Sequence, residues 1–219
     1  MTVRITGSFP LPLFRAVERE EFAQSFVEQG SFRLRPLKVY WEMEDENRRD
    51  KDEGEARLEL NGDRPVLTIE PASGQVLSKT MEYGRIQWGR SLSGPCYVLC
   101  FSGPAVDIKY LGQKYGRHIV RINKPDLLVN DIASYLEQYA NLPYGKRLDC
   151  VQVRYNKDLP APSEPTDEEK EVLSYGQKAP KDSNDHEYRI VLMLPFTGYD
   201  PPEMINVQLH KKLQYAEIL

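Results

Sequence analysis

Two arginines, Arg33 and Arg35, are the first residues of this chain whose types and spacing could do chemistry. They alternate with Phe32 and Leu34, which is the pattern of a strand with one buried face, so both guanidinium groups would lie on the other face. A planar guanidinium holds a phosphate or pyrophosphate through paired hydrogen bonds. Two interpretations stay open: a pair of solvated arginines on a half-buried strand, or an anion site that faces a cleft.

A dense acidic segment follows at residues 42–55. It contains eight carboxylates mixed with three basic residues, Arg48, Arg49 and Lys51. Several oxygen ligands could bind the divalent cation that a nuclease needs, but the spacing matches neither a calcium loop nor a two-metal set. The basic residues also neutralise part of the charge. The segment is therefore interpreted as a solvated charged loop, and the alternatives are the wall of a binding cleft and a metal site.

Other chemical signatures are missing from the sequence. Its three histidines, His118, His186 and His210, belong to no Ser-His-Asp order, so a hydrolase triad is unsupported. The glycines at positions 112 and 116 lie too close together for a phosphate-binding loop. The three cysteines occur in no zinc spacing and suit a reducing compartment, so we expect packed cysteines and no metal site.

The composition is that of an ordinary globular protein. The chain has 219 residues, of which 40% are hydrophobic and 28% charged, so it can form a core without disulfides. The net charge of -4 excludes a chain-wide basic field for nucleic acid but not a local basic patch. No stretch approaches the roughly 20 apolar residues of a membrane-spanning helix, and the N-terminus lacks a signal-peptide pattern. We expect a cytoplasmic protein with no membrane partner.

The elements that must position these residues follow from periodicity and turn signals. Helices are expected at residues 16–29, ended by Gly30, and at 125–139, opened by Pro125. Strands are expected at 31–41, 56–60, 66–70, 97–102, 116–122, 148–155, 187–194 and 203–209. Residues 1–15 are expected to form an irregular arm, and the C-terminal tail to be frayed.

This order predicts an α+β fold with a mostly antiparallel sheet and a few helices. The Asn-Gly turn at 61–62 predicts a hairpin between the strands at 56–60 and 66–70. No shift in composition marks a boundary, so residues 1–219 are expected to form a single domain. Residues 157–186 are rich in Pro, Glu, Asp, Lys and Ser, and are expected to be a mobile loop with one helical turn at 166–174.

Three short motifs occur in a suggestive order along the chain. They are Phe32-Arg33-Leu34-Arg35-Pro36-Leu37, Cys100-Phe101-Ser102 at a strand end, and His186-Glu187-Tyr188-Arg189-Ile190 after a long loop. This order resembles a group of bacterial and phage-associated proteins, and it is similar to the ADP-ribosyltransferase fold. The chain departs from the usual pattern, because Leu34 stands where a small residue often follows the arginine and Cys-Phe-Ser replaces the commoner Ser-Thr-Ser.

The resemblance implies an NAD-dependent enzyme that transfers ADP-ribose to a macromolecular acceptor, either protein or nucleic acid. It implies Glu187 as the catalytic carboxylate, which would stabilise positive charge on the ribose. NAD would be bound by arginines on the phosphates, a serine at the strand end and a tyrosine stacked on nicotinamide. The candidates for these roles are Arg33, Arg35, Ser102, Tyr40 and Tyr110. A toxin or phage-defence effector of this kind would also have a neutralising partner, such as an antitoxin.

Two other functions stay open. One is a catalytically inactive module of the same fold that binds a protein, in which Glu187 is a strand-edge carboxylate paired to Arg189 or Lys181. The other is a metal-dependent nuclease that uses the carboxylates of residues 42–55. The transferase hypothesis requires that the arginine, the serine and Glu187 converge on one cleft.

Overall fold

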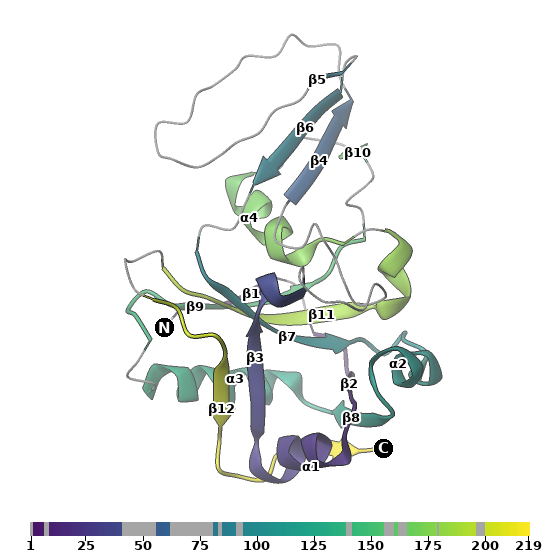
Figure 1. Cartoon of the computed structure of the whole chain (residues 1–219), viewed down its shortest axis with the longest axis vertical. Coiled ribbons are helices and arrows are strands. Elements are labelled where there is room, and N and C mark those ends of the chain that lie inside the picture. Colours follow the sequence, from purple (N-terminus) through teal and green to yellow (C-terminus); the bar gives the residue numbers. More distant parts are fainter. Residues whose placement is uncertain are drawn as a thin grey trace. The chain divides into compact units, whose positions relative to one another are not determined.

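The fold is described from a computed structural model of the chain (Figure 1). The described residues are 2–6, 9–40, 56–61, 81–82, 85–90, 94–138, 142–155, 160–161, 166–178, 180–195 and 200–219. The chain divides into two compact units, each described by itself. Unit 1 comprises Met1–Pro36, Gly94–Val153 and Asn184–Leu219, and unit 2 comprises Leu37–Ser93 and Arg154–Ser183. The single domain expected for residues 1–219 stays a prediction.

Unit 1 is a branched β-sheet with helices. Its strands are β1 (Thr2–Thr6), β2 (Leu13–Val17), β3 (Ser31–Pro36), β7 (Cys96–Ser102), β8 (His118–Ile122), β9 (Arg147–Gln152), β11 (Glu187–Met193), β12 (Ile205–Gln208) and β13 (Ala216–Ile218). Its helices are α1 (Glu20–Gln29), α2 (Ile108–Tyr115) and α3 (Pro125–Gln138). The strand order is β1-β9-β11-β7-β2-β8-β13, with β3 also paired to β7 and β12 paired to β3. Only β1–β9 is parallel among these pairs, which confirms the mostly antiparallel sheet in the described part of the chain.

Strand β7 is the centre of this sheet (Figure 1). One of its edges pairs with β11 along its whole length. The other edge is shared, because β3 pairs with its beginning, where Arg35 lies opposite Val98, and β2 pairs with its end at Ser102. Between these two partners, the guanidinium of Arg15 donates to the carbonyl of Cys100 at 2.8 Å. Arg15 therefore satisfies a backbone acceptor at the point where the sheet branches.

The main hydrophobic core lies on one face of the sheet. Alternate residues of the central strands point into it, among them Leu99 of β7, Ile190 of β11 and Cys150 of β9. Helices α1 and α3 contribute Phe26 and Ile132 to the same core. A smaller cluster joins α2 to β2 and β8 and consists of Phe14, Val106, Leu111 and Ile119. Because successive strand residues point to opposite faces, the residues that flank those of the main core form a second face.

Local sequence signals determine where the helices begin and end. Gly30 ends α1 in the left-handed conformation with φ 59°, and its N–H donates to the Phe26 carbonyl. Asp107 caps α2, because its carboxylate accepts from the N–H of Lys109 at 2.8 Å. Pro125 opens α3, as expected for a residue without an N–H. No helix in the described ranges is both long and apolar enough to cross a membrane.

Unit 2 contains a small sheet in the order β10-β4-β6-β5. These strands are β4 (Ala56–Asn61), β5 (Met81–Glu82), β6 (Arg85–Arg90) and β10 (Pro160–Ala161). The unit also contains η1 (Leu37–Tyr40) and α4 (Asp167–Gly176), and η2 (Pro180–Asp185) leads from it into unit 1. The end of α4 is joined to the chain at Arg154, whose N–H donates to the Gly176 carbonyl at 2.8 Å.

Several predicted elements are confirmed. Strands β7, β8, β9 and β11 and helix α3 occur where the sequence predicts them. Strand β3 shows the expected alternation, since Phe32 and Leu34 are buried whereas Arg33 and Arg35 are exposed. The predicted strand at 31–41 is too long, however, because the chain turns into η1 after Pro36.

The predictions for the two ends of the chain are wrong. Residues 2–6 and 13–17 form strands instead of an irregular arm, and α1 consequently begins at Glu20. The prolines at 10 and 12 precede β2 and do not interrupt it, so they leave its pairing with β8 intact. The C-terminal tail is not frayed, because β13 pairs with β8.

Two predictions fall on unit 2. The strand expected at 66–70 lies outside the described residues, and β4 pairs instead with β6 and β10. The segment 157–186 was expected to hold one helical turn, but it contains the ten-residue helix α4 and the 3-10 helix η2. Leu173 and Tyr175 of α4 are buried, which gives this polar-rich segment a packed side. Its mobility stays a prediction.

Candidate functional site

Ser102 and Glu187 lie directly opposite each other in unit 1, at the end of β7 and the start of β11. Residues paired across antiparallel strands point to the same face, and here it is the face opposite the main core. Both residues are nearly buried, with Ser102 5% exposed and Glu187 6% exposed. Two of the predicted site residues therefore meet, in an environment with little access to water.

The carboxylate of Glu187 is already paired with a guanidinium group. Arg189 Nε donates to Glu187 Oε1 at 2.6 Å, and the two side chains are only 2% and 7% exposed. The residues are two apart on β11, so their side chains lie on one face of the sheet. Of the two partners that the sequence suggested for Glu187, the structure shows Arg189.

A second carboxylate, Asp185, lies two residues before Glu187 and is held by helix α2. Lys114 Nζ donates to its Oδ1 at 2.8 Å, Tyr110 OH donates to the same oxygen at 2.9 Å, and Tyr115 OH donates to Oδ2 at 2.7 Å. Asp185 is 2% exposed, so these three donors replace water around it. We call these four residues the Asp185 cluster.

The spacing on α2 explains why one short helix supplies all three donors. Tyr110 and Lys114 are four residues apart and therefore lie on one side, where Lys114 Nζ also donates to Tyr110 OH at 3.1 Å. Leu111 is four residues before Tyr115 and is buried against β2 and β8. The apolar side of α2 thus fixes the helix on the sheet. Tyr115 packs its ring on this side, and its hydroxyl reaches Asp185 together with the two donors of the polar side.

Charge and burial keep the donors of the Asp185 cluster protonated. Burial raises the pKa of Tyr115 far above its usual range, and the charges of Glu187 and Asp185 raise it further. Burial, the largest single effect, lowers the pKa of Lys114, but the hydrogen bonds to Asp185 and Tyr110 and the charge of Asp185 together outweigh it and raise that pKa. Burial likewise raises the pKa of Tyr110. The cluster is therefore a neutralised carboxylate, and Glu187 has a cationic partner of its own in Arg189.

The backbone between the two carboxylates is unusual. His186 separates Asp185 from Glu187 and has a φ of 44°, in the left-handed region that side chains rarely adopt. Its carbonyl accepts from the N–H of Gly103, the residue after Ser102, at 2.8 Å. Strain of this kind is found most often near functional sites. His186 thus connects the Asp185 cluster to the Ser102–Glu187 pair at one corner of the sheet.

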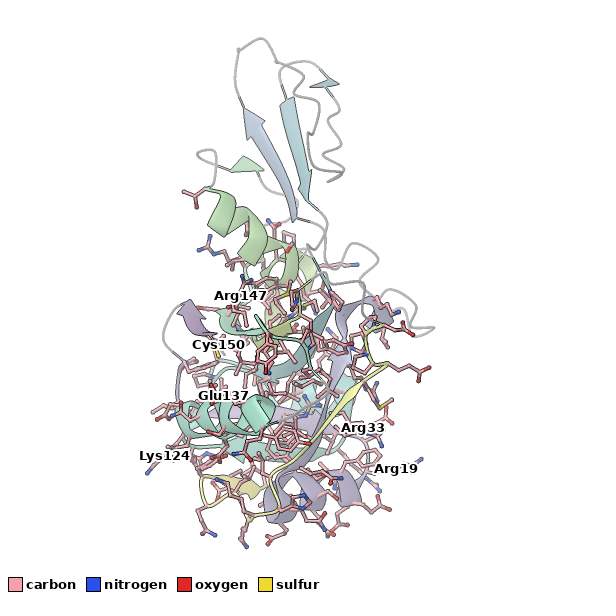
Figure 2. All side chains as sticks on the ribbon, turned by 90° about the vertical axis from the view of Figure 1, so that its left-hand side faces the viewer. Arg19, Arg33, Lys124, Glu137, Arg147 and Cys150 are labelled. Atoms are coloured by element: carbon pink, nitrogen blue, oxygen red, sulfur yellow. The ribbon has the colours of Figure 1, made fainter. Side chains whose placement is uncertain are left out.

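The two arginines that were predicted to bind NAD do not lie at this corner of the sheet. Arg33, labelled in Figure 2, lies on β3, where the strand register pairs it with Asn206 of β12, and Arg35 lies opposite Val98. Val98 is four residues before Ser102, which is about 13 Å along an extended strand. Of the tyrosines, Tyr110 reaches the corner through Asp185, whereas Tyr40 ends η1 in unit 2. The arginines that do lie near Ser102 are Arg189, on β11, and Arg15, on β2.

Sequence reasoning missed most members of this corner. Lys114 and Asp185 are 71 residues apart, so no local pattern joins them. The available signals were a tyrosine and a lysine four residues apart, and two carboxylates two residues apart at the start of a clear strand. Arg15 was missed because residues 1–15 were expected to be irregular.

No group of three or more His, Cys, Asp or Glu residues that could hold a metal occurs in the described ranges. The carboxylates of residues 42–55 lie outside those ranges, so the nuclease hypothesis stays a prediction. Comparisons with protein-family models, with curated proteins and with solved structures found no match to this chain. The function must therefore be argued from the residues themselves.

Proposed function

We propose that the chain is an NAD-dependent ADP-ribosyltransferase that acts as a toxin or phage-defence effector on a macromolecular acceptor. The observation that carries this proposal is the position of Glu187 directly opposite Ser102, with the Tyr110-bearing Asp185 cluster beside it. A carboxylate, a strand-end hydroxyl and a phenol thus share one corner of unit 1. Those are three of the groups that the resemblance to the transferase fold requires.

The polar and aromatic groups at this corner are of the types that could bind a nicotinamide nucleotide. Ser102 and Glu187 would hold the nicotinamide ribose, and Tyr110 would lie against the nicotinamide ring. When bound, NAD supplies a glycosidic bond whose cleavage builds positive charge on the ribose. Glu187 stabilises such charge best where water is excluded, and both it and Ser102 are nearly buried. Arg189 orients the Glu187 carboxylate through its Nε–H. Arg33 and Arg35 have no part in this corner.

The test is nicotinamide release from NAD by the purified chain, with cell lysate as the source of acceptor. Glu187→Gln should abolish release while thermal unfolding shows a folded protein, since the amide keeps the shape of the side chain and loses its charge. Glu217→Gln is the matched control, because Glu217 is exposed and pairs only loosely with Arg121 at 3.5 Å. Absence of release with every lysate, together with no thermal shift in NAD, contradicts the proposal.

A second candidate is a catalytically inactive module that binds a protein. It is favoured by the ion pair of Glu187 with Arg189, in which Glu187 Oε1 is already used by a group of the chain itself. In that case Glu187→Gln changes stability only. Capture of a defined partner by the wild type and by Glu187→Gln with equal affinity, without nicotinamide release, distinguishes this module from the enzyme.

A further inference from the structure

The outer face of the β3–β12 ribbon carries an unusual set of side chains. On β3, Phe32 and Leu34 are buried in the main core whereas Arg33 and Arg35 are exposed. On β12, Ile205 and Val207 are buried and the two residues that alternate with them are exposed. The exposed residues of the two strands are Arg33, Arg35, Asn206 and Gln208. Two guanidinium and two carboxamide groups therefore share one surface.

The strand register places these groups close together. Arg33 lies directly opposite Asn206, and Ser31 lies opposite Gln208. Side chains directly opposite each other in an antiparallel pair are about 5 Å apart, and those two apart on one strand are about 7 Å apart. The face is thus a small grid of hydrogen-bonding groups (Figure 2 labels Arg33 within it).

The grid is cationic, and within the described part of the chain it forms no ion pair. Neither β3 nor β12 contains an acidic residue. Elsewhere in the described part of the chain, Lys211 and Lys212 are held by carboxylates at 2.7 and 2.8 Å, but no described residue forms an ion pair with Arg33 or Arg35. Both guanidinium groups are therefore available to an external anion, although the chain as a whole carries a net charge of -4.

The chemistry of this face selects among anionic partners. Guanidinium forks bind phosphate oxygens in pairs, and Asn and Gln present a donor and an acceptor together, which matches the edge of a base. The ionised side chains of an acidic peptide are acceptors only, so the carboxamide oxygens would have to take their donors from its backbone. Two-stranded ribbons also fit the grooves of nucleic acids.

We propose that the outer face of the β3–β12 ribbon binds nucleic acid. Arg33 and Arg35 contact successive phosphates, while Asn206 and Gln208 contact base edges or sugars. This proposal is independent of NAD and of the corner at Ser102 and Glu187. It identifies a surface of unit 1 through which the chain meets a polyanion.

The test measures binding of the full chain, without NAD, to fluorescent 20-nucleotide probes by anisotropy. The probes are single-stranded DNA, the same DNA as duplex, and RNA. The double variant Arg33→Gln/Arg35→Gln should weaken binding at least tenfold and reduce the slope of log affinity against log salt by about 1.4–1.8, since each lost phosphate contact changes it by about 0.7–0.9. The matched control is Arg117→Gln/Lys124→Gln, which removes two exposed positive charges from other positions of unit 1 and should leave affinity within twofold.

A second pair of variants tests the carboxamides. Asn206→Ala/Gln208→Ala should reduce the preference for the best probe over an abasic strand of equal length, with the salt slope unchanged. Equal weakening by the ribbon and control variants would overturn the proposal. So would polyglutamate competing as well as nucleic acid, because the face would then fit an acidic protein. Binding that survives in Glu187→Gln separates this result from the test of the transferase.

Discussion

Asp185 and Lys114 form a nearly buried ion pair of 2.8 Å, with side chains 2% and 14% exposed. The pair joins Asp185, two residues before β11, to α2, and two tyrosine hydroxyls also donate to the carboxylate. Removing one member of such a pair leaves an uncompensated buried charge. The buried charge that remains lowers the free energy of unfolding by more than the intact pair contributes to it.

Asp185→Ala should therefore destabilise unit 1 by about 3–5 kcal/mol, because it leaves the Lys114 ammonium and two phenols without their acceptor. The free energy of urea unfolding measures the loss. Asp131→Ala is the matched control, since Asp131 also accepts from a lysine and a tyrosine, Lys211 and Tyr215, but Lys211 is 52% exposed. The control should lose about 1 kcal/mol. Equal losses at the two positions would show that burial does not set the cost.

Arg189→Met should cost about 3–5 kcal/mol for the same reason, because it leaves Glu187 charged and without its guanidinium partner. Adding Glu187→Leu to that variant should restore most of the lost stability, since two apolar residues of similar volume can replace a buried pair. A double-mutant cycle measured by urea unfolding gives the coupling. A coupling near zero would mean that the pair does not act as a unit.

Gly116→Ala should destabilise the chain by about 2–4 kcal/mol. Gly116 has a φ of 133°, and a Cβ there would collide with the backbone of Val17. Gly112→Ala in the middle of α2 is the contrasting change, because the nearest atom to its new Cβ is the Arg117 Cα at 4.0 Å. It should stabilise the helix by about 0.5–1 kcal/mol. Thermal unfolding of the two variants should shift in opposite directions.

Stability should fall between pH 9 and 10 through the thiol of Cys150. Burial first, and then the charge of Asp149, raises the pKa of this thiol from 9.0 to about 12. In that window the unfolded chain loses the proton and the folded chain keeps it, so the free energy of unfolding decreases as pH rises. The contribution from pH 9 to 10 is about 1 kcal/mol. Cys150→Ala should show a shallower decrease in urea unfolding at pH 8, 9 and 10, whereas an unchanged slope would contradict the assignment.

Periodicity predicted the elements with strong alternation or a long apolar stripe. Strand β3 and helix α3 are examples, since Leu34 and Ile132 mark faces that burial in the core then fixes. Helix α2 was not predicted, because in eight residues it buries only Leu111 and includes a glycine. Strand β13 has three residues and exists only through its pairing with β8. Such short elements are specified by tertiary contacts and not by their own pattern.

The candidate site was predictable only in part, for a related reason. The order of motifs brought Ser102 and Glu187 together correctly, because antiparallel neighbours in a central sheet place strand ends side by side. Arg33 does not reach Ser102, because β3 pairs with β12 over its first four residues and meets β7 only at Arg35 and Pro36. The position at which a sheet branches depends on tertiary packing and cannot be predicted from a single residue. Arg189 lies only two residues from Glu187 and is the arginine that pairs with it.

The centre of the sheet is assembled from distant parts of the chain, and this matters during synthesis. Strands β2 and β3 precede β7, but β11, which covers its other edge, ends at Met193, 91 residues after Ser102. At ordinary rates of translation, of roughly 5–20 residues per second, β7 waits about 5–18 s for that neighbour. An edge left open this long is a template for misplaced strands. The nascent chain therefore has a period in which this edge of β7 is exposed to mispairing.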